Sequence, residues 1–238
     1  MFLQRKKSLL KSGFLEGFTD RHSHLLPGVD DGFRTMEETL DAFEYMESAG
    51  VSEIWLTPHI MEDIPNTTAD LRERFNELTA AYKGTIKLRL ASENMLDNLF
   101  EQRLAANDLL PMDDSILLVE TSYFNPPIEF QKLLGDIVAK GYRPLLAHPE
   151  RYKYMDIDDY ASLKEQGILF QLNLGAIAGG YSKETQHKAA ELLARGWYDF
   201  VGSDCHSLLH YQSAVNAPLS RSVIAAIRKT IKEFKQTT

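Results

Sequence analysis

Short apolar runs alternate with amphipathic stretches along almost the whole of this 238-residue chain. Seven of the runs have the length and the β-branched or aromatic content of buried strands. They cover residues 17–24, 53–59, 85–93, 115–121, 143–148, 168–174 and 198–204. Helical stretches separate most of them, and this alternation predicts an α/β fold with a parallel sheet. The sheet can close into a barrel or stay open and doubly wound, and one barrel domain fits the length of the chain.

Several intervening segments carry the start and stop signals of helices. Thr35 and Glu38 form a capping box that opens a helix ending near Gly50. Apolar residues at helical spacing, with a glycine after each segment, predict further helices over 68–83, 128–140 and 184–195. The intervals 94–114 and 149–167 carry the weakest signals.

The charge balance and the cysteine count bear on the class of protein. A net charge of -8 disfavours a nucleic-acid surface, which needs clustered Lys and Arg. The single cysteine, Cys205, leaves no intrachain disulfide, which suits a reducing cytoplasm. No apolar run approaches the length of a membrane span. We therefore expect a cytoplasmic protein that does not bind nucleic acid.

Residues 1–16 precede the first predicted strand and mix basic with apolar side chains. They lack the continuous apolar segment of a secretory signal. We expect a frayed N-terminal extension, with a peripheral membrane or partner contact as the alternative. The domain itself is expected over residues 17–238.

Residue types that bind metals stand at the carboxyl ends of six of the seven predicted strands. His22 and His24 flank one residue, so both imidazoles point to the same face of an extended strand. Asp204 and His206 repeat that spacing on the seventh strand. The second to fifth strands end in His59, Glu93, Glu120 and His148. Because active sites of parallel α/β folds form at the carboxyl ends of the strands, we expect these side chains to converge.

Most of these candidates also have a purely structural interpretation. Two strand histidines could be hydrogen-bonded in a core, and a buried strand-end carboxylate could form an ion pair. Asp30 and Asp31 lie in Pro-Gly-Val-Asp-Asp-Gly, which is also a good turn sequence, so one of them could serve only to shape the loop. The sixth strand offers only Asn173, a weak candidate, and we interpret His187 and His210 as surface residues.

The nine expected metal ligands are His22, His24, Asp31, His59, Glu93, Glu120, His148, Asp204 and His206. One zinc ion with four ligands cannot use them all, so two or three divalent ions are expected. Mixed imidazole and carboxylate ligation suits manganese, iron or zinc. Such a site favours metal-assisted hydrolysis, and paired ions match phosphate esters. Arg151 could hold a phosphate oxygen with its planar guanidinium, although a surface arginine is the alternative.

The motifs around these residues resemble those of the polymerase-and-histidinol-phosphatase superfamily over about residues 17–235. The stretches that carry the resemblance are Asp20-x-His22-x-His24, Leu-Pro-Gly-x-Asp30-Asp31-Gly32, Thr-Pro-His59, Glu93, Ala-His148-Pro-Glu-Arg151-Tyr152 and Ser-Asp204-x-His206. More narrowly, they are similar to the bacterial protein-tyrosine phosphatases of this superfamily that are encoded with capsule and exopolysaccharide genes.

The resemblance implies a distorted seven-stranded barrel and a trinuclear metal site that is usually manganese-dependent. By position, the first ion would take His22, His24, Glu93 and Asp204; the second Glu93, Glu120 and His148; and the third Asp31, His59 and His206. Arg151, Asp204 and His206 would be catalytic, with Arg151 binding the substrate phosphate. The substrate would be the phosphotyrosine tail of a bacterial tyrosine autokinase that controls polysaccharide synthesis.

One segment departs from the pattern that the resemblance implies. Related phosphatases often carry a second arginine shortly after the last histidine, whereas this chain has none between His206 and Arg221. Position 211, where that second phosphate contact would be sought, is Tyr. The same residue excludes a cysteine-based phosphatase, which needs an arginine six positions after its nucleophile; here Cys205 is the only cysteine. Phosphatase chemistry in this chain is therefore expected to use direct attack by water.

Two other functions compete with a protein-tyrosine phosphatase. A small-molecule phosphatase of the histidinol-phosphate type would use the same residues in a more enclosed pocket. A kinase-binding regulator that keeps a metal site but does not catalyse is compatible with the missing second arginine. Turnover of a phosphotyrosine peptide separates both from the leading hypothesis. A nuclease is disfavoured by the acidic surface.

Overall fold

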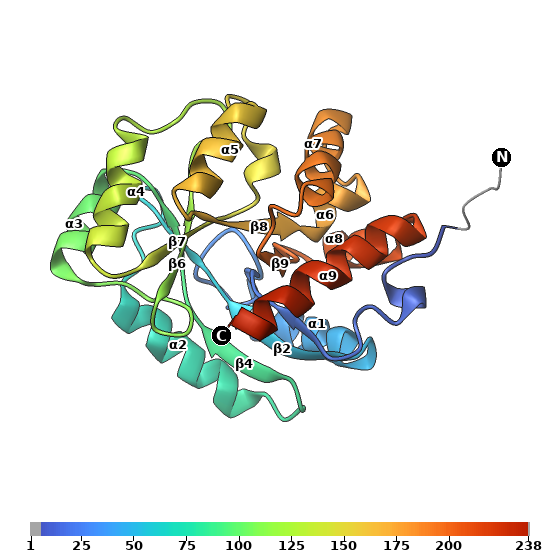
Figure 1. Cartoon of the computed structure of the whole chain (residues 1–238). Coiled ribbons are helices and arrows are strands. Elements are labelled where there is room, and N and C mark those ends of the chain that lie inside the picture. Colours follow the sequence, from blue (N-terminus) through green and yellow to red (C-terminus); the bar gives the residue numbers. More distant parts are fainter. Residues whose placement is uncertain (1–5, 238) are drawn as a thin grey trace.

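Nine short strands, each paired in parallel with its neighbours, form the centre of the computed structural model, which describes residues 6–237 and the side chains of residues 6–231. The strands are β1 (Phe18–Asp20), β2 (Val51–Leu56), β3 (His59–Ile60), β4 (Lys87–Leu90), β5 (Glu93–Met95), β6 (Ile116–Glu120), β7 (Arg143–Leu146), β8 (Leu169–Asn173) and β9 (Phe200–Gly202). Helices lie around them on the outside of the molecule (Figure 1). The predicted α/β class and parallel strand direction are confirmed.

The strands divide between two sheets, of order β1-β2-β4 and β3-β5-β6-β7-β8-β9. Two of the predicted strands, 53–59 and 85–93, each break in two where the chain passes from the first sheet to the second. The first break falls at Pro58, which has no N–H to donate to a neighbouring strand. The second falls at residues 91–92, next to the first in space, since Glu93 N donates to Pro58 O at 3.0 Å. The prediction of seven uninterrupted strands was therefore wrong at these two places.

The parallel strands curve into a half-barrel whose two outer ends approach each other. A parallel bridge joins Ser23, after β1, to Cys205, after β9. Asp204 N donates to His22 O at 2.8 Å, and His24 N donates to Cys205 O at 3.0 Å. These bonds bring residues 22–24 (His-Ser-His) and residues 204–206 (Asp-Cys-His) next to each other.

Nine α-helices are described in the part of the chain that the structure covers. They are α1 (Met36–Ser48), α2 (Thr68–Ala81), α3 (Asn98–Ala106), α4 (Phe130–Ala139), α5 (Ile157–Glu165), α6 (Leu174–Ala178), α7 (Lys183–Ala194), α8 (Leu208–Asn216) and α9 (Arg221–Thr237). The predictions of α1, α2, α4 and α7 are confirmed, including the capping box of Thr35 and Glu38. Sequence reasoning did not define the other five. Among the described residues, no helix is long and apolar enough to cross a membrane.

The N-terminal segment packs against the domain rather than fraying from it, as far as it is described. Leu9 and Leu15 are fully buried in the main hydrophobic core, and Phe14 is nearly so. Lys7 pairs with Leu219 through two main-chain hydrogen bonds of 2.9 Å. The expectation of a frayed extension was therefore wrong for residues 6–16, because their apolar side chains cover the core. Residues 1–5, which carry part of the predicted basic arm, lie outside the described residues.

Candidate metal centre and phosphate site

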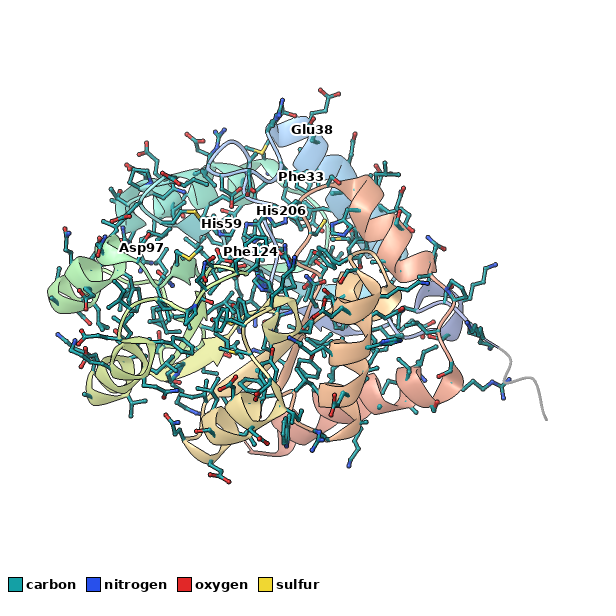
Figure 2. All side chains as sticks on the ribbon, turned by 90° about the horizontal axis from the view of Figure 1, so that it is seen from above. Phe33, Glu38, His59, Asp97, Phe124 and His206 are labelled. Atoms are coloured by element: carbon teal, nitrogen blue, oxygen red, sulfur yellow. The ribbon has the colours of Figure 1, made fainter. Side chains whose placement is uncertain are left out.

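The nine predicted ligands lie together in space. Seven of them lie at or after the carboxyl ends of β1, β6, β7 and β9, whereas His59 begins β3 and Glu93 begins β5, so the expectation that these two residues end strands was wrong. Figure 2 looks down on this end of the molecule and shows His59 and His206 near its middle, between Phe33 and Phe124. Seven of the nine side chains are buried; the exceptions are Asp31, which is 64% exposed, and His206, which is 27% exposed. The opening to solvent is therefore on the side of Asp31 and His206.

The innermost group consists of His22, His24, Glu93 and Asp204. The Nε2 atoms of the two histidines are 3.1 Å apart. Glu93 Oε2 lies 3.1 Å from His22 Nε2 and 3.3 Å from His24 Nε2, and Asp204 Oδ1 lies 3.5 and 3.4 Å from the same atoms. Four donor atoms thus converge on one point, in the grouping expected for the first ion.

The second group forms around the two glutamates. His59 Nδ1 lies 3.2 Å from Glu93 Oε2 and 3.0 Å from Glu120 Oε1, so His59, Glu93 and Glu120 converge. His148 Nε2 approaches the other side of Glu93, 3.1 Å from Oε1, and is 3.8 Å from Glu120 Oε2. The expected trio of Glu93, Glu120 and His148 is thus brought together, with His59 as an addition that the resemblance did not imply here.

The outermost group contains the expected trio of Asp31, His59 and His206, joined by His24. Asp31 Oδ1 lies 3.3 Å from His206 Nε2 and 3.6 Å from His59 Nε2. His59 therefore presents one ring nitrogen to each of two groups, and its imidazole lies between them.

Several buried polar atoms of this cluster have no hydrogen-bond partner in the part of the chain that the structure describes. Within the described residues, both carboxylate oxygens of Glu93, Oε1 of Glu120, Oδ1 of Asp204 and Nδ1 of His59 are buried and have no hydrogen-bond partner. Buried polar groups are rarely left unpaired, because each costs about 1–3 kcal/mol or more when charged. These atoms are lone-pair donors that point at one another, and divalent cations satisfy that arrangement. The residues present therefore fit metal ions.

Neighbouring groups set the tautomers of three histidines. His22 Nδ1 donates to Gln171 Oε1 at 2.9 Å, His24 Nδ1 donates to Asp30 Oδ2 at 2.8 Å, and His206 Nδ1 donates to the carbonyl oxygen of residue 204 at 3.0 Å. With a proton on Nδ1, each ring turns the lone pair of Nε2 toward the cluster, as a metal ligand requires. Asp30 thus orients a ligand and accepts from Gly32 N, while Asp31 faces the cluster.

The charges of the cluster depend on one another. Burial disfavours a charged His22, but the carboxylates of Glu93 and Asp204 outweigh it and raise the pKa of His22 to about 9. Burial by itself would raise the pKa of Glu93, but the imidazoles of His22 and His59 hold that pKa well below its usual range. His206 beside it lowers the pKa of Asp31 to about 2. Glu93 and Asp31 are thus ionised, and binding of a metal would displace the proton from His22.

Arg151 lies on the other side of Asp204. Its Nη1 donates to Asp204 Oδ2 at 3.0 Å. Its guanidinium carbon lies 4.1 Å from the ring centroid of Tyr123 and 4.6 Å from that of Tyr181, so two aromatic rings hold the cation. Asn173 donates to the same Asp204 oxygen at 2.7 Å and to the Tyr181 hydroxyl at 3.2 Å. We call these residues (Arg151, Tyr123, Tyr181 and Asn173) the arginine clamp.

The backbone is strained at two of the strand ends. His148 and Asp204 adopt left-handed conformations with φ of 32° and 53°, which non-glycine residues adopt rarely. Such strain is found where the surrounding structure needs a side chain in a particular place. At Gly202, on β9, a Cβ would lie only 2.5 Å from His22 Cβ. A glycine at this position therefore lets the strand pack closely against His22.

The segment after His206 forms α8. Tyr211 is buried there against Tyr45, so no cation reaches the site from position 211. His210 is half-buried with its ring edge against Tyr181, which corrects its assignment to the surface; His187 is exposed as expected. Cys205 is buried, and burial raises the pKa of its thiol well above the ordinary value, which does not suit a nucleophile.

Sequence reasoning missed Gln171 and gave Asn173 only as a weak ligand candidate, whereas both residues orient others. Gln171 and Asn173 both lie on β8, the strand that lacked a ligand, and hold His22 and Asp204 through side-chain hydrogen bonds. Their spacing of two residues, the same as that of His22 and His24, was the available signal. Tyr123 and Tyr181 had no comparable signal, because they come from loops.

A pocket of about 440 Å³ opens beside the outermost group. Asp31, Phe33, Arg34 and His206 are among the residues that line it. Because Asp31 and His206 are also the most exposed candidate ligands, this pocket is the open approach to the cluster.

A family model described as capsular polysaccharide synthesis, CpsB/CapC, matches residues 18–234. The chain belongs to the CpsB/CapC family. A relative, the tyrosine-protein phosphatase YwqE of Bacillus subtilis, is 30% identical over 209 residues, which are 82% of each chain. The tyrosine-protein phosphatase CpsB of Streptococcus agalactiae is 26% identical and covers 79% of this chain and 83% of its own.

Two solved structures place the CpsB/CapC chain among known folds. One, described as YwqE from Bacillus subtilis and CpsB from Streptococcus pneumoniae, metal-dependent tyrosine phosphatases, superposes with a TM-score of 0.79 at 24% identity. It covers 93% of this chain and 96% of its own. The histidinol phosphate phosphatase of Lactococcus lactis gives a TM-score of 0.52 at 17% identity, with 92% and 94% coverage. Both likenesses concern the fold.

Proposed function

We propose that this chain is a metal-dependent protein-tyrosine phosphatase that acts on the phosphorylated tail of a bacterial tyrosine kinase controlling capsule or exopolysaccharide synthesis. The observation that carries the proposal is the convergence of buried, unpaired carboxylate and imidazole atoms beside one clamped arginine. Membership of the CpsB/CapC family and the names of the relatives support the substrate class. We propose a cytoplasmic location for the enzyme, where its single cysteine would stay reduced.

The proposed ligands are the nine residues of the three groups, which together would hold three divalent ions. His22, His24, Glu93 and Asp204 would hold the first, Glu93, Glu120 and His148 the second, and Asp31, His59 and His206 the third. We propose manganese as the native metal, since mixed oxygen and nitrogen ligands suit it; iron and zinc are the alternatives. In this proposal the two sheets act as one distorted seven-stranded barrel of residues 17–238, with the ions at its carboxyl end.

The chemistry that divalent ions supply in such sites is acidification of water and neutralisation of charge on phosphoryl oxygens. Arg151 would bind the phosphate with the guanidinium N–H groups that Asp204 leaves free, and the two tyrosine rings would fix its orientation. Asp204 would link the two functions, because one of its oxygens faces the histidines and the other holds Arg151. No covalent enzyme intermediate is needed.

The chemistry of the leaving group also favours tyrosine phosphate. A phenolate has a pKa of about 10, far below that of an alkoxide, so tyrosine phosphate needs less protonation as its ester bond breaks. Histidinol phosphate, the alternative substrate, releases an alkoxide. The open approach beside Asp31 and His206 also suits a side chain presented on a protein.

Chelation and metal readdition test the proposal. Purified protein should contain two or three divalent ions per chain by elemental analysis. It should hydrolyse p-nitrophenyl phosphate and a phosphotyrosine peptide, lose both activities after chelation, and regain them with Mn²⁺. Turnover of histidinol phosphate without turnover of the peptide would favour the small-molecule alternative. Peptide binding without turnover, in protein that carries its metals, would favour a regulator.

A further inference from the structure

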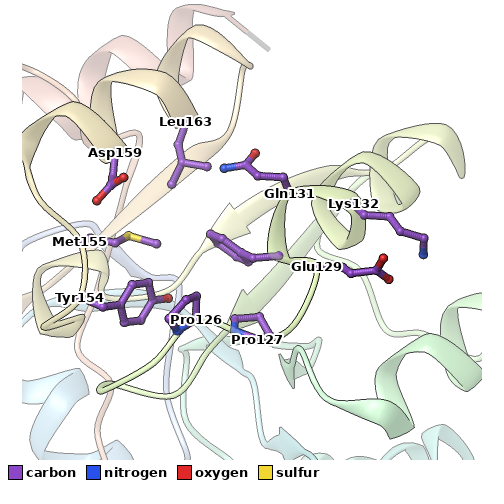
Figure 3. Close-up of a pocket in the computed structure, with 10 residues that line it drawn as sticks. Pro126, Pro127, Glu129, Gln131, Lys132, Tyr154, Met155, Asp159 and Leu163 are labelled. Carbon is purple, nitrogen blue, oxygen red and sulfur yellow. The ribbon is translucent and has the colours of Figure 1, made fainter.

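A second pocket, of about 790 Å³, lies between α4 and α5 (Figure 3). Phe130, Met155 and Leu163 line it, and the last two are almost fully buried, so they form its floor. Tyr154 also lines the pocket, together with Pro127 from the loop that follows β6. The volume lies in the range of ligand-binding pockets, and the floor is apolar.

The loop between β6 and α4, residues 121–129, lies between this pocket and the arginine clamp. Tyr123 contacts Arg151, while Pro126, Pro127 and Glu129 line the pocket. The two places are also joined by stacked rings. Tyr154 stacks on Tyr152 at 5.8 Å between centroids, and Tyr152 stacks on Tyr123 at 6.3 Å. One segment of chain therefore contributes to both places.

The surface of this loop is unusually apolar. Phe124 is 63% exposed and Ile128 is 91% exposed. Among the described side chains, only two other large hydrophobic residues are comparably exposed: Leu209, three residues after His206, and Val138. Three of the four thus stand on segments that also supply the candidate site. Large apolar side chains exposed on segments that supply a candidate site favour an interaction surface there.

We propose that the pocket between α4 and α5 binds an apolar side chain of the same peptide whose phosphotyrosine enters the catalytic site. This rests on the proposed function and narrows its substrate to an extended peptide. The occupant is inferred from continuity, because the loop of residues 121–129 supplies both Tyr123, which contacts Arg151, and prolines that line the pocket. An extended chain advances about 3.3 Å per residue, and the three ring contacts limit the separation of Arg151 from Tyr154, so the span corresponds to at most about five residues.

A leucine scan tests the position of the anchor. Fluorescein-labelled phosphotyrosine peptides with a Gly-Ser background would carry one leucine, placed in turn about two to seven residues from the phosphotyrosine on either side. Binding to the metal-loaded protein would be followed by fluorescence anisotropy. We expect affinity to rise about three- to tenfold at one or two adjacent positions on one side, because a leucine side chain is buried there. A flat scan on both sides would overturn the proposal.

Two variants assign the effect to this pocket. Ile128→Ser removes an exposed side chain between the pocket-lining residues, and Gln131→Trp places a large ring at the pocket edge. Both should abolish the leucine advantage, and neither should alter hydrolysis of p-nitrophenyl phosphate. Val138→Ser, which removes an exposed apolar side chain near the carboxyl end of α4 and outside the pocket lining, should keep the advantage.

The failure of docking is distinguishable from the failure of the proposed function. Binding by anisotropy does not depend on turnover, so an inactive protein with a positional leucine advantage would contradict the phosphatase and keep the pocket. An active phosphatase with a flat scan would contradict the pocket alone. Self-association that Ile128→Ser abolishes, together with a flat scan, would assign the pocket to a second copy of the chain and overturn the proposal.

Discussion

The two oxygens of Asp204 face two halves of the site that are built differently. Oδ1 lies 3.5 Å from His22 Nε2 and 3.4 Å from His24 Nε2, in the histidine–carboxylate cluster. Oδ2 accepts hydrogen bonds from Arg151 and Asn173, in the arginine clamp. Oδ1 has no hydrogen-bond donor among the described residues, whereas Oδ2 has two.

The contrast shows what each half requires to work. The cluster presents buried lone pairs that the protein leaves unpaired, so it is complete only with cations. The arginine clamp is complete by itself, because hydrogen bonds and aromatic rings already hold the guanidinium. A site that is held in place before the reaction does not have to reorganise during it. Changes in the cluster should therefore remove metal, and changes in the clamp should weaken phosphate binding while the metal stays.

The largest effect is expected from Glu93→Gln. Four imidazoles, those of His22, His24, His59 and His148, lie within 3.3 Å of the two carboxylate oxygens of Glu93. An amide removes the charge that two groups of ligands share, so we expect activity to fall about 10³-fold or more, equivalent to several kcal/mol. Elemental analysis should show at least one ion fewer per chain.

Glu53→Gln is the matched control for that variant. Glu53 is also a strand carboxylate paired with cationic side chains, Arg89 at 2.7 Å and Lys87 at 3.6 Å, but it lies outside the cluster. It should keep its metals and its activity. A Glu93→Gln protein with full metal content and wild-type turnover would break the proposed distinction between the two halves.

The two halves also differ in how far the sequence revealed them. The cluster was visible because polar residues that end apolar strands are unusual, and the His-x-His spacing puts two side chains on one face. All nine predicted ligands do lie in one place. Of the clamp, the sequence indicated Arg151 and, weakly, Asn173. Tyr123 and Tyr181 lie in loops, where no periodicity predicts which side chains will meet.

The same reasoning explains what was missed in the fold. The positions and direction of the strands follow from the apolar runs. The division into two sheets depends instead on which backbone N–H groups form hydrogen bonds near Pro58, and a single sequence does not show this. Helix α5 begins with a capping box of two aspartates, Asp156 and Asp159, rather than the more recognisable Ser or Thr with Glu. The packing of residues 6–16 depends on a tertiary contact with Leu219 that has no local signal.

A second prediction tests the clamp directly. Arg151→Lys keeps the positive charge but loses the planar fork that can hold Asp204 and a phosphate together. We expect kcat/KM for p-nitrophenyl phosphate to fall about 10²- to 10³-fold, the scale of removing one preorganised donor from a transition state. Metal content should be unchanged, and loss of an ion in this variant would show that the two halves are not separable.

A third prediction concerns a residue that serves the cluster without binding metal. Gln171→Met removes the amide that accepts from His22 Nδ1 and from His148 N. Orienting partners of this kind are typically worth about 10- to 100-fold in metal affinity. We expect a weaker apparent affinity for Mn²⁺ in titrations of the stripped protein, with kcat recovering at saturating metal.

Gln212→Met, a change of the same residue type on α8, is the control for Gln171→Met and should leave the Mn²⁺ titration unchanged. A kcat of Gln171→Met that stays low at saturating Mn²⁺ would mean that the amide acts on the reaction itself rather than through His22.

The smallest effect is expected at Tyr181. Its ring contacts the Arg151 guanidinium, and its hydroxyl accepts from Asn173, so Tyr181→Leu removes both contacts while Tyr181→Phe removes only the second. A cation–π contact is worth about 0.5–2 kcal/mol, so Tyr181→Leu should raise KM or lower kcat/KM by about 2- to 30-fold. Tyr181→Phe should recover most of that loss if the ring positions Arg151. Equal defects in both variants would instead place the effect in the hydroxyl and its bond to Asn173, and would make the clamp depend on Asp204 and Asn173 more than on its aromatic rings.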